Sequence, residues 1–265
     1  MADATTNTGL TRGRMPGMSP DSSLGAGGTG AADLGEYWTN TGAVRGPIPR
    51  QEAQSLVGRS MAMIADPQPL GLAGFAAATW TISTVVAGWH SFAALAAAVP
   101  IAIFFGGVAQ FLAGMWAFRR GNVLAATAFS TFGAFNVAFG AWILLTAAKL
   151  IPSTRFGGTS AAYVAGWFII TFGVIAAYLA VAALADNLVL VAILVTLAIT
   201  YIFDGLGTMI VGPNNWATYI GGYAGIVSSL IAFYLSAAIV INSTWGREVL
   251  PMLSTRGSSG SRARP

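Results

Sequence analysis

The sequence predicts an all-α membrane protein with six transmembrane helices and polar tails at both ends. Only 8% of its 265 residues are charged and 55% are hydrophobic, whereas a soluble domain carries about 25% charged residues. The mean hydropathy of +0.68 is strongly positive. Apolar segments long enough to cross a bilayer, which requires about 20 residues, recur along the chain. Together these observations place the chain in the membrane class.

Residues 1–60 form a polar stretch rich in Gly, Ser and Thr, which we expect to be a disordered cytoplasmic tail. The stretch has no apolar core region, so it does not resemble a signal peptide. A short interfacial helix is a further possibility for residues 51–64, because Leu56, Met61 and Ile64 fall on one side of it. The sequence has no cysteine, so neither disulfides nor thiol chemistry is expected.

Six apolar segments follow this tail and make up a transporter domain at residues 61–246. The predicted spans are 70–88, 92–118, 122–148, 161–184, 188–203 and 216–241. Pro100 lies inside the second span and should either kink that helix or mark its true start. The fifth span should end at Asp204-Gly205, which would leave the Asp204 carboxyl at the membrane interface. Residues 247–265 form a basic cytoplasmic tail.

The distribution of Lys and Arg predicts the orientation of these spans. With the N-terminus inside, Lys149 and Arg155 lie on the outer side of the membrane. The cytoplasmic side then holds Arg12, Arg14, Arg45, Arg50, Arg59, Arg119, Arg120, Arg247, Arg256, Arg262 and Arg264. We therefore expect both termini to be cytoplasmic. The net charge of +4 comes from these tails and loops, so a nucleic-acid partner is not indicated.

The segment 66–75, Asp-Pro-Gln-Pro-Leu-Gly-Leu-Ala-Gly-Phe, stands where the polar tail meets the first span. Pro67 and Pro69 lack an N–H, so a helix can start at Pro69 or Leu70 at little cost. Gly71 leaves a smooth face for a neighbouring helix. The free N–H groups of this first turn would favour an anion at the membrane mouth. Alternatively, the motif only caps a membrane helix.

Enzyme chemistry finds little support in the sequence. His90, the one histidine, falls in a short loop and is expected to be an interfacial polar residue. We recognise no metal-ligand spacing, no phosphate-binding loop and no activated nucleophile, so we expect no catalytic residue, metal or cofactor. Most hydroxyl residues in the spans are interpreted as packing residues. Gln110 and Asn136 differ, because their amide groups need a polar partner or pore water within the membrane.

Three blocks in the same order and spacing resemble the acetate uptake transporter family, which includes the bacterial succinate–acetate permeases (YaaH type). The first is the Pro-x-Pro-Leu-Gly-Leu-x-Gly-Phe motif ending at Phe75. The second runs from Gly106-Gly107 through Gln110 and Arg119-Arg120-Gly121-Asn122 to Thr127-Ala128-Phe129. The third is Trp245-Gly246-Arg247-Glu248-Val249-Leu250-Pro251, preceded by Phe233-Tyr234-Leu235. The resemblance covers roughly residues 65–251.

This resemblance implies six helices around a narrow pore in each subunit and a homohexameric assembly. It implies passage of acetate and, in some members, of succinate. It also places the hydrophobic constriction at Phe75, Phe132 and, by a looser alignment, Val195. The expected substrate-binding or pore-mouth residues are Asp66, Pro67, Pro69, Leu70, Gly71, Gln110, Thr131, Asn136 and Ala232.

Four positions depart from the family pattern and put the substrate range in question. The family usually has Asn where this chain has Asp66, whose acid would either repel a carboxylate or cap the helix. It often has Tyr at Phe132, Trp at Asn136 and a Leu where Val195 stands.

The function that follows is a transporter or channel in the plasma membrane, or in the inner membrane of a bacterium, for acetate and related short carboxylates. A bare carboxylate crosses an apolar constriction at high cost, so co-movement of a proton or passage of the neutral acid is expected. Two alternatives stay open. The chain transports another small solute such as ammonia, or it is a non-transporting membrane scaffold or sensor.

Overall fold

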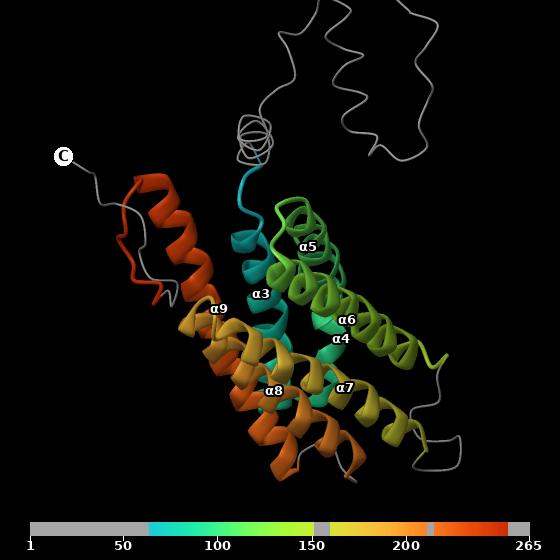
Figure 1. Cartoon of the computed structure of the whole chain (residues 1–265). Coiled ribbons are helices and arrows are strands. Elements are labelled where there is room, and N and C mark those ends of the chain that lie inside the picture. The colour runs from blue at the N-terminus through green and yellow to red at the C-terminus, as the bar shows by residue number, and fades with distance from the viewer. Residues whose placement is uncertain (1–63, 151–159, 211–214, 254–265) are drawn as a thin grey trace, which may run out of the picture. The chain divides into compact units, whose positions relative to one another are not determined.

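The computed structural model describes residues 64–150, 160–210 and 215–253, in which the regular elements are helices (Figure 1). Six of them are long and apolar enough to cross a membrane. These spans are Gln68–Val86, Phe92–Arg119, Val123–Ala147, Ala161–Ala183, Leu188–Met209 and Trp216–Trp245. The six-helix prediction is therefore confirmed. The expected tail at 1–60 lies outside the described residues, as does the possible interfacial helix at 51–64 except for its last residue.

The first span, α3 (Gln68–Val86), starts inside the proline motif. Pro67 occupies the N-cap position and Pro69 the first turn, where a missing N–H costs little. The Asp66 carboxylate accepts a hydrogen bond from the N–H of Gln68 at 3.0 Å. Asp66 thus fills one of the two roles considered for it, stabilising the start of α3.

The second span changes its helical register at Pro100. A 3₁₀ turn, η1 (Phe92–Ala94), and a short helix, α4 (Leu95–Pro100), lead into the nine-residue π-helix η2 (Ile101–Ala109). The span ends with α5 (Gln110–Arg119). Proline removes a backbone donor from the ladder, and the wider π register begins directly after it. The break expected at Pro100 is therefore a change of helix type within one continuous span.

Asparagine side chains cap three later spans at their first turns. These helices are α6 (Val123–Ala147), α8 (Leu188–Met209) and α9 (Trp216–Trp245), capped by Asn122, Asn187 and Asn215. At each cap the shortest bond from a first-turn N–H to the side-chain oxygen measures between 2.7 and 3.1 Å. Asn is among the best N-cap residues because its oxygen satisfies an otherwise free donor.

The fifth span, α8, does not end at Asp204-Gly205 but continues to Met209, so that expectation was wrong. Asp and Gly often end a helix exposed to water, but here Gly205 lies at a close crossing with α7 (Ser160–Ala183). A Cβ at Gly205 would lie 2.6 Å from the carbonyl oxygen of Gly166 in α7. Helix packing therefore extends α8, and Asp204 lies inside the span rather than beyond it.

The helices pack so that α3 contacts both α9 and η2, while α8 contacts both α7 and α9 (Figure 1). Glycines allow the closest of these approaches. A Cβ at Gly222 of α9 would lie 2.4 Å from the backbone nitrogen of Ala87, just after α3. A Cβ at Gly74 of α3 would lie 2.5 Å from the carbonyl oxygen of Phe105 in η2. Such contacts bring the walls of the bundle together around α3.

Candidate permeation pathway

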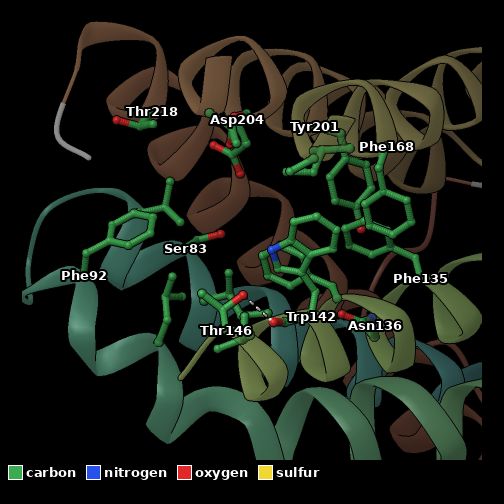
Figure 2. A pocket seen from close by; sticks show the side chains of 18 of the residues that line it. Ser83, Phe92, Phe135, Asn136, Trp142, Thr146, Phe168, Tyr201, Asp204 and Thr218 are labelled. Carbon is green, nitrogen blue, oxygen red and sulfur yellow. Dashed lines mark hydrogen bonds between the residues drawn. The ribbon is translucent and has the colours of Figure 1, made fainter. Parts of the chain in front are cut away.

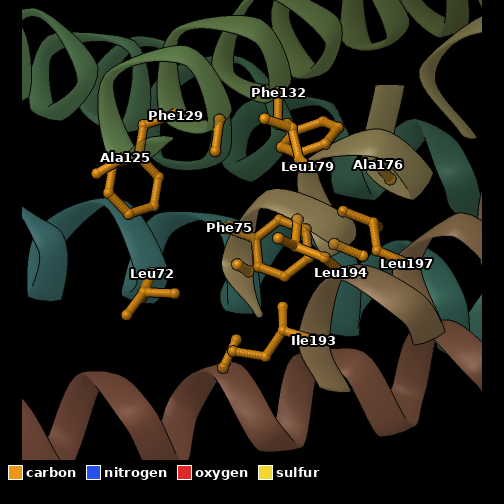
Figure 3. Close-up of a cluster of buried hydrophobic side chains, with 14 of the residues drawn as sticks. Leu72, Phe75, Ala125, Phe129, Phe132, Ala176, Leu179, Ile193, Leu194 and Leu197 are labelled. Atoms are coloured by element: carbon orange, nitrogen blue, oxygen red, sulfur yellow. The ribbon is translucent and has the colours of Figure 1, made fainter. Parts of the chain in front are cut away.

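A tight apolar cluster occupies the middle of the bundle (Figure 3). Phe75 of α3 and Phe132 of α6 are 3% and 2% exposed, and their ring centroids lie 6.5 Å apart. Leu197 of α8 belongs to the same cluster and is 1% exposed. We call Phe75, Phe132 and Leu197 the neck. It contains no polar side chain, so an ion passing between these residues would lose its water.

On one side of the neck lies a cavity of about 330 Å³, which we call the Asp204 cavity (Figure 2). Its walls come from α3, η1, α4, α6, α7, α8 and α9. Aromatic rings dominate one side of it: the Phe135 centroid lies 4.7 Å from that of Tyr201 and 5.4 Å from that of Phe168. Hydroxyl groups of Thr79, Ser83 and other residues line the rest.

On the other side of the neck lies a cavity of about 450 Å³, the Asp66 cavity. It is bounded by the first residues of α3, α6 and α8 and by the last turns of α9. Its polar lining residues are Asp66, Gln68, Asn122, Asp186, Asn187, Asn242 and Ser243. The neck therefore separates two hollows that open toward opposite ends of the helices.

The same order of cavity, neck and cavity repeats on separate helices, so the two cavities and the neck lie in line along the bundle. Along α3 it is Leu72, Phe75, Thr79. On α6 the order is Phe129, Phe132, Asn136, and on α8 it is Leu194, Leu197, Thr200. Each step of three or four residues moves about 5 Å along a helix, so the neck is only about two helical turns long.

Most polar side chains of the Asp66 cavity are hydrogen-bonded to backbone N–H groups. Asp66, Asn122 and Asn187 cap the helices that begin there. Asn242 accepts the N–H groups of Val249 and Leu250 at 2.7 and 2.9 Å and so fastens the segment after α9. These residues shape the mouth, but their strongest hydrogen bonds are already made within the protein.

The first turn of α3 offers an anion less than the motif indicated. The N–H of Gln68 is capped by Asp66, Pro69 has none, and the N–H of Gly71 bonds to the carbonyl of Pro67 at 3.1 Å. Pro67 and Gly71 are buried, whereas Leu70 is 47% exposed. Most N–H groups of this first turn are therefore not free to bind a carboxylate, contrary to the anion-binding hypothesis.

Gln110 and Asn136 form the buried amide pair that their position in the membrane required. Asn136 is 2% exposed, and its Nδ2 donates to the Gly106 carbonyl at 3.1 Å and to Gln110 Oε1 at 3.3 Å. Gln110 is fully buried, and its Nε2 has no hydrogen-bond partner among the described residues. Asn136 also lines the Asp204 cavity. The pair joins α6 to the π-helical part of the second span.

Val195, assigned to the constriction by the looser alignment, does not belong to the neck. Its side chain is 45% exposed and takes no part in the apolar cluster, whereas Leu197 of the same helix does. Successive helical residues are turned by about 100°, so two positions separate a buried face from an exposed one. Of the remaining predicted residues, Ala232 is fully buried in the cluster, and half-buried Thr131 lines neither cavity.

Two residues of this path, Leu197 and Asp204, were missed although the sequence contained a signal for them. Residues 190, 194, 197, 201 and 204 follow the spacing of one helical face. Their side chains line the Asp66 cavity, the neck and the Asp204 cavity in turn. Ending the fifth span at Asp204 hid the last member of this face.

Asp204 is the one carboxylate that lines the Asp204 cavity within the described ranges. It lies one turn beyond Tyr201 on α8, half-buried, with its carboxyl turned toward the hollow (Figure 2). Its Oδ1 atom is buried and has no hydrogen-bond partner in the described part of the chain. This sets Asp204 apart from the carboxylate of Asp66, which is engaged in a cap.

Comparison with known proteins gives consistent matches over the helical region. Residues 53–253 match the GPR1/FUN34/yaaH family. The succinate-acetate/proton symporter SatP of Escherichia coli K12 is 29% identical over 189 residues, 71% of this chain and 95% of that protein. The ammonia transport outward protein 2 of Saccharomyces cerevisiae is 31% identical over 174 residues, 64% of this chain and 59% of that protein. The solved structure of the bacterial acetate channel SatP matches with a TM-score of 0.64 and 26% identity, covering 71% of this chain and 99% of that one.

Proposed function

This chain belongs to the GPR1/FUN34/yaaH family, and we propose that it is a multi-pass transporter or channel for acetate and related short carboxylates. The named relatives, a succinate-acetate/proton symporter and an acetate channel, support this substrate class. The carrying observation is the arrangement of two cavities on either side of the neck. A pathway of this form holds a small solute on each side and admits it through a dry constriction.

The chemistry of the neck supports passage with neutralised charge. Phe75, Phe132 and Leu197 offer no donor to a carboxylate, so a bare anion would cross at the full cost of its desolvation. A carboxylic acid, or a carboxylate accompanied by a proton, avoids most of that cost. We therefore favour proton-coupled passage or passage of the neutral acid, and a transport role rather than an enzymatic one.

We also propose the membrane orientation, the location and the oligomeric state of the protein. We place both termini in the cytoplasm, because of the Lys and Arg distribution, and the protein in the plasma membrane. Large apolar side chains such as Phe104, Val174 and Val181 are 57–70% exposed on the outer surface of the bundle. They fit contact with lipid or with further copies of the chain, and by family resemblance we propose a homohexamer.

Transport of ammonia is the second candidate, because the yeast relative named for outward ammonia transport matches this chain at 31% identity. A dry neck passes a small neutral molecule without a partner ion. The two candidates differ in substrate selectivity, so a direct comparison of acetate and ammonia flux in one preparation distinguishes them.

The test compares two truncations on α8 in proteoliposomes loaded for uptake of labelled acetate and succinate. Leu197→Ala widens the neck, so we expect succinate uptake to rise several-fold relative to acetate uptake. Val195→Ala removes a similar volume two residues away, on the exposed face, and should leave that ratio unchanged. Equal effects of the two substitutions, or no acetate uptake by the unmodified protein, would count against the proposed pathway.

A further inference from the structure

We infer that Asp204 is the proton-binding residue of this pathway and hands its proton to an incoming carboxylate before the substrate enters the neck. The inference rests on the proposed function and deepens it by assigning the coupling to one side chain. It is drawn from the position of the Asp204 carboxyl, its missing partner and the composition of the walls around it.

The Asp204 side chain is half-buried, and one of its two carboxyl oxygens is enclosed without a hydrogen-bond donor among the described residues. Its Oδ1 packs against α9 at Gly221, where an added Cβ would lie 1.9 Å from that oxygen. The same oxygen is buried and accepts no hydrogen bond from the described residues. A buried ionised carboxylate without donors is strongly disfavoured in a membrane-spanning bundle. The protonated acid is neutral and is the form that this position tolerates.

The described residues that line this cavity supply no positive charge. Tyr201 on α8 itself is the other titratable group that lines this cavity in the described ranges. The walls packed against α8 present uncharged side chains. The polar and aromatic residues of these walls include Ser83 from α3, Phe92 from η1, Asn136, Trp142 and Thr146 from α6, Phe168 from α7 and Thr218 from α9 (Figure 2). A salt bridge is therefore not what keeps the acid at this position.

A proton fits this position better than a metal cation does. Alkali and alkaline-earth ions need about six oxygen ligands around one point. The Thr200 and Thr208 hydroxyls near Asp204 donate to backbone carbonyls of their own helix at 2.9 and 2.7 Å. No group of three or more acidic, histidine or cysteine side chains that could hold a metal occurs among residues 64–150, 160–210 and 215–253. A proton needs only the carboxylate itself.

Asp204 lies on the cavity side of the neck, about two helical turns beyond Leu197 along α8. It is one helical turn from Tyr201, a distance of about 4.5 Å along the axis. The Tyr201 ring lies 6.0 Å from the Phe132 ring of the neck. A substrate carboxylate that enters the neck from the Asp204 cavity therefore leaves the compartment that this acid lines.

The transfer step is balanced without any further reactant. The O–H bond of protonated Asp204 breaks and a new O–H bond forms on the substrate carboxylate, leaving an Asp204 carboxylate and a neutral carboxylic acid. The substrate carboxylate occupies the same cavity, whose described lining offers it no positive charge either, so the transfer exchanges one enclosed carboxylate for another. The neutral acid crosses the neck, and Asp204 takes a new proton from the water on its own side of the membrane.

The experiment measures acetate uptake into proteoliposomes under an imposed proton gradient and, separately, under an imposed membrane potential. Wild-type uptake should follow the proton gradient, rising as the pH falls on the side of the Asp204 cavity. Asp204→Asn keeps the shape but cannot release a proton, so its uptake should lose the gradient response. The control Glu248→Gln makes the same carboxyl-to-amide change at an exposed residue outside both cavities and should respond like wild type.

A full gradient response in Asp204→Asn would overturn the inference. Infrared difference spectra give a readout that needs no substrate. A protonated-carboxyl band that disappears on alkalisation in wild type and is missing in Asp204→Asn supports the assignment, and identical spectra of the two proteins refute it. Wild-type protein that shows this band but moves no acetate would defeat the proposed function while leaving the proton site in place.

Discussion

The two cavities contain similar polar atoms but use them differently. In the Asp66 cavity the carboxylate of Asp66 and the amides of Asn122, Asn187 and Asn242 make hydrogen bonds to backbone N–H groups. In the Asp204 cavity the buried oxygen of Asp204 has no such partner among the described residues. The polar groups of the Asp66 cavity therefore act as structural caps, whereas the Asp204 cavity contains a carboxyl oxygen that can still accept a hydrogen bond.

This difference separates residues that shape the mouth from residues that interact with the solute. A capping side chain lowers the free energy of the folded state, and its effect on transport is indirect. An acid inside a membrane span with a buried oxygen that accepts no hydrogen bond from the described residues is costly, and such an acid is a candidate for a functional role. Substitutions on the two sides of the neck test whether mouth-shaping residues and solute-contacting residues are separate.

The largest structural effect is expected for Gly221→Ala in α9, which packs against Asp204 of the Asp204 cavity. A Cβ there would lie 1.9 Å from Asp204 Oδ1 and 2.9 Å from the Asp204 backbone nitrogen, so rotating the side chain cannot relieve the clash. We expect a loss of about 1–3 kcal/mol in the free energy of unfolding, together with a shift in the response of acetate uptake to pH. Thermal unfolding in detergent and uptake measurements check the two parts.

The matched change near the other cavity is Gly71→Ala in α3, beside the ring of Phe129, which lines the Asp66 cavity. The added Cβ would lie 2.8 Å from that ring but touches no foreign backbone atom at such a distance, so the ring can tilt away. We expect the smaller loss of stability of the two and an unchanged pH response. A larger loss than that of Gly221→Ala would break the comparison.

The smallest effect is expected for Asn187→Ala, which removes the cap of α8. The side-chain oxygen of Asn187 accepts the N–H groups of Val189 and Leu190 at 2.7 and 3.2 Å. Losing a helix cap costs about 1 kcal/mol, so the unfolding midpoint should fall modestly while proton coupling persists. Loss of the gradient response in this variant would show that the Asp66 cavity does more than shape the mouth.

The sequence predicted most of the fold because hydropathy and membrane thickness determine the length of each span. It also predicted that Gln110 and Asn136 need a polar partner or pore water, and the structure pairs the two amides with each other. It misplaced the end of α8, because Asp204-Gly205 resembles a helix stop when the close contact of Gly205 with α7 is unknown. Such contacts between helices are not visible in the order of residues.

The residues predicted for the constriction lie differently in the structure, and their role in a pathway stays a prediction. Phe75 and Phe132 lie in motifs whose spacing is specific, and the structure places both rings in the neck. The third member depended on an alignment through a uniform apolar span, where a shift of two residues changes little in composition. That shift exchanged the exposed Val195 for the buried Leu197. Val195 and Leu197 differ in exposure because of their rotational positions on the helix, not because of their residue types.

The most direct test of the pathway uses the absence of cysteine from the chain. Thr79→Cys places one thiol in the Asp204 cavity, a helical turn from Phe75 of the neck. Labelled-acetate uptake into proteoliposomes is measured before and after treatment with a small thiol reagent, with the cysteine-free protein as control. We predict that modification stops uptake by Thr79→Cys and leaves the control unchanged. Undiminished uptake after complete modification would contradict a single path through the two cavities and the neck.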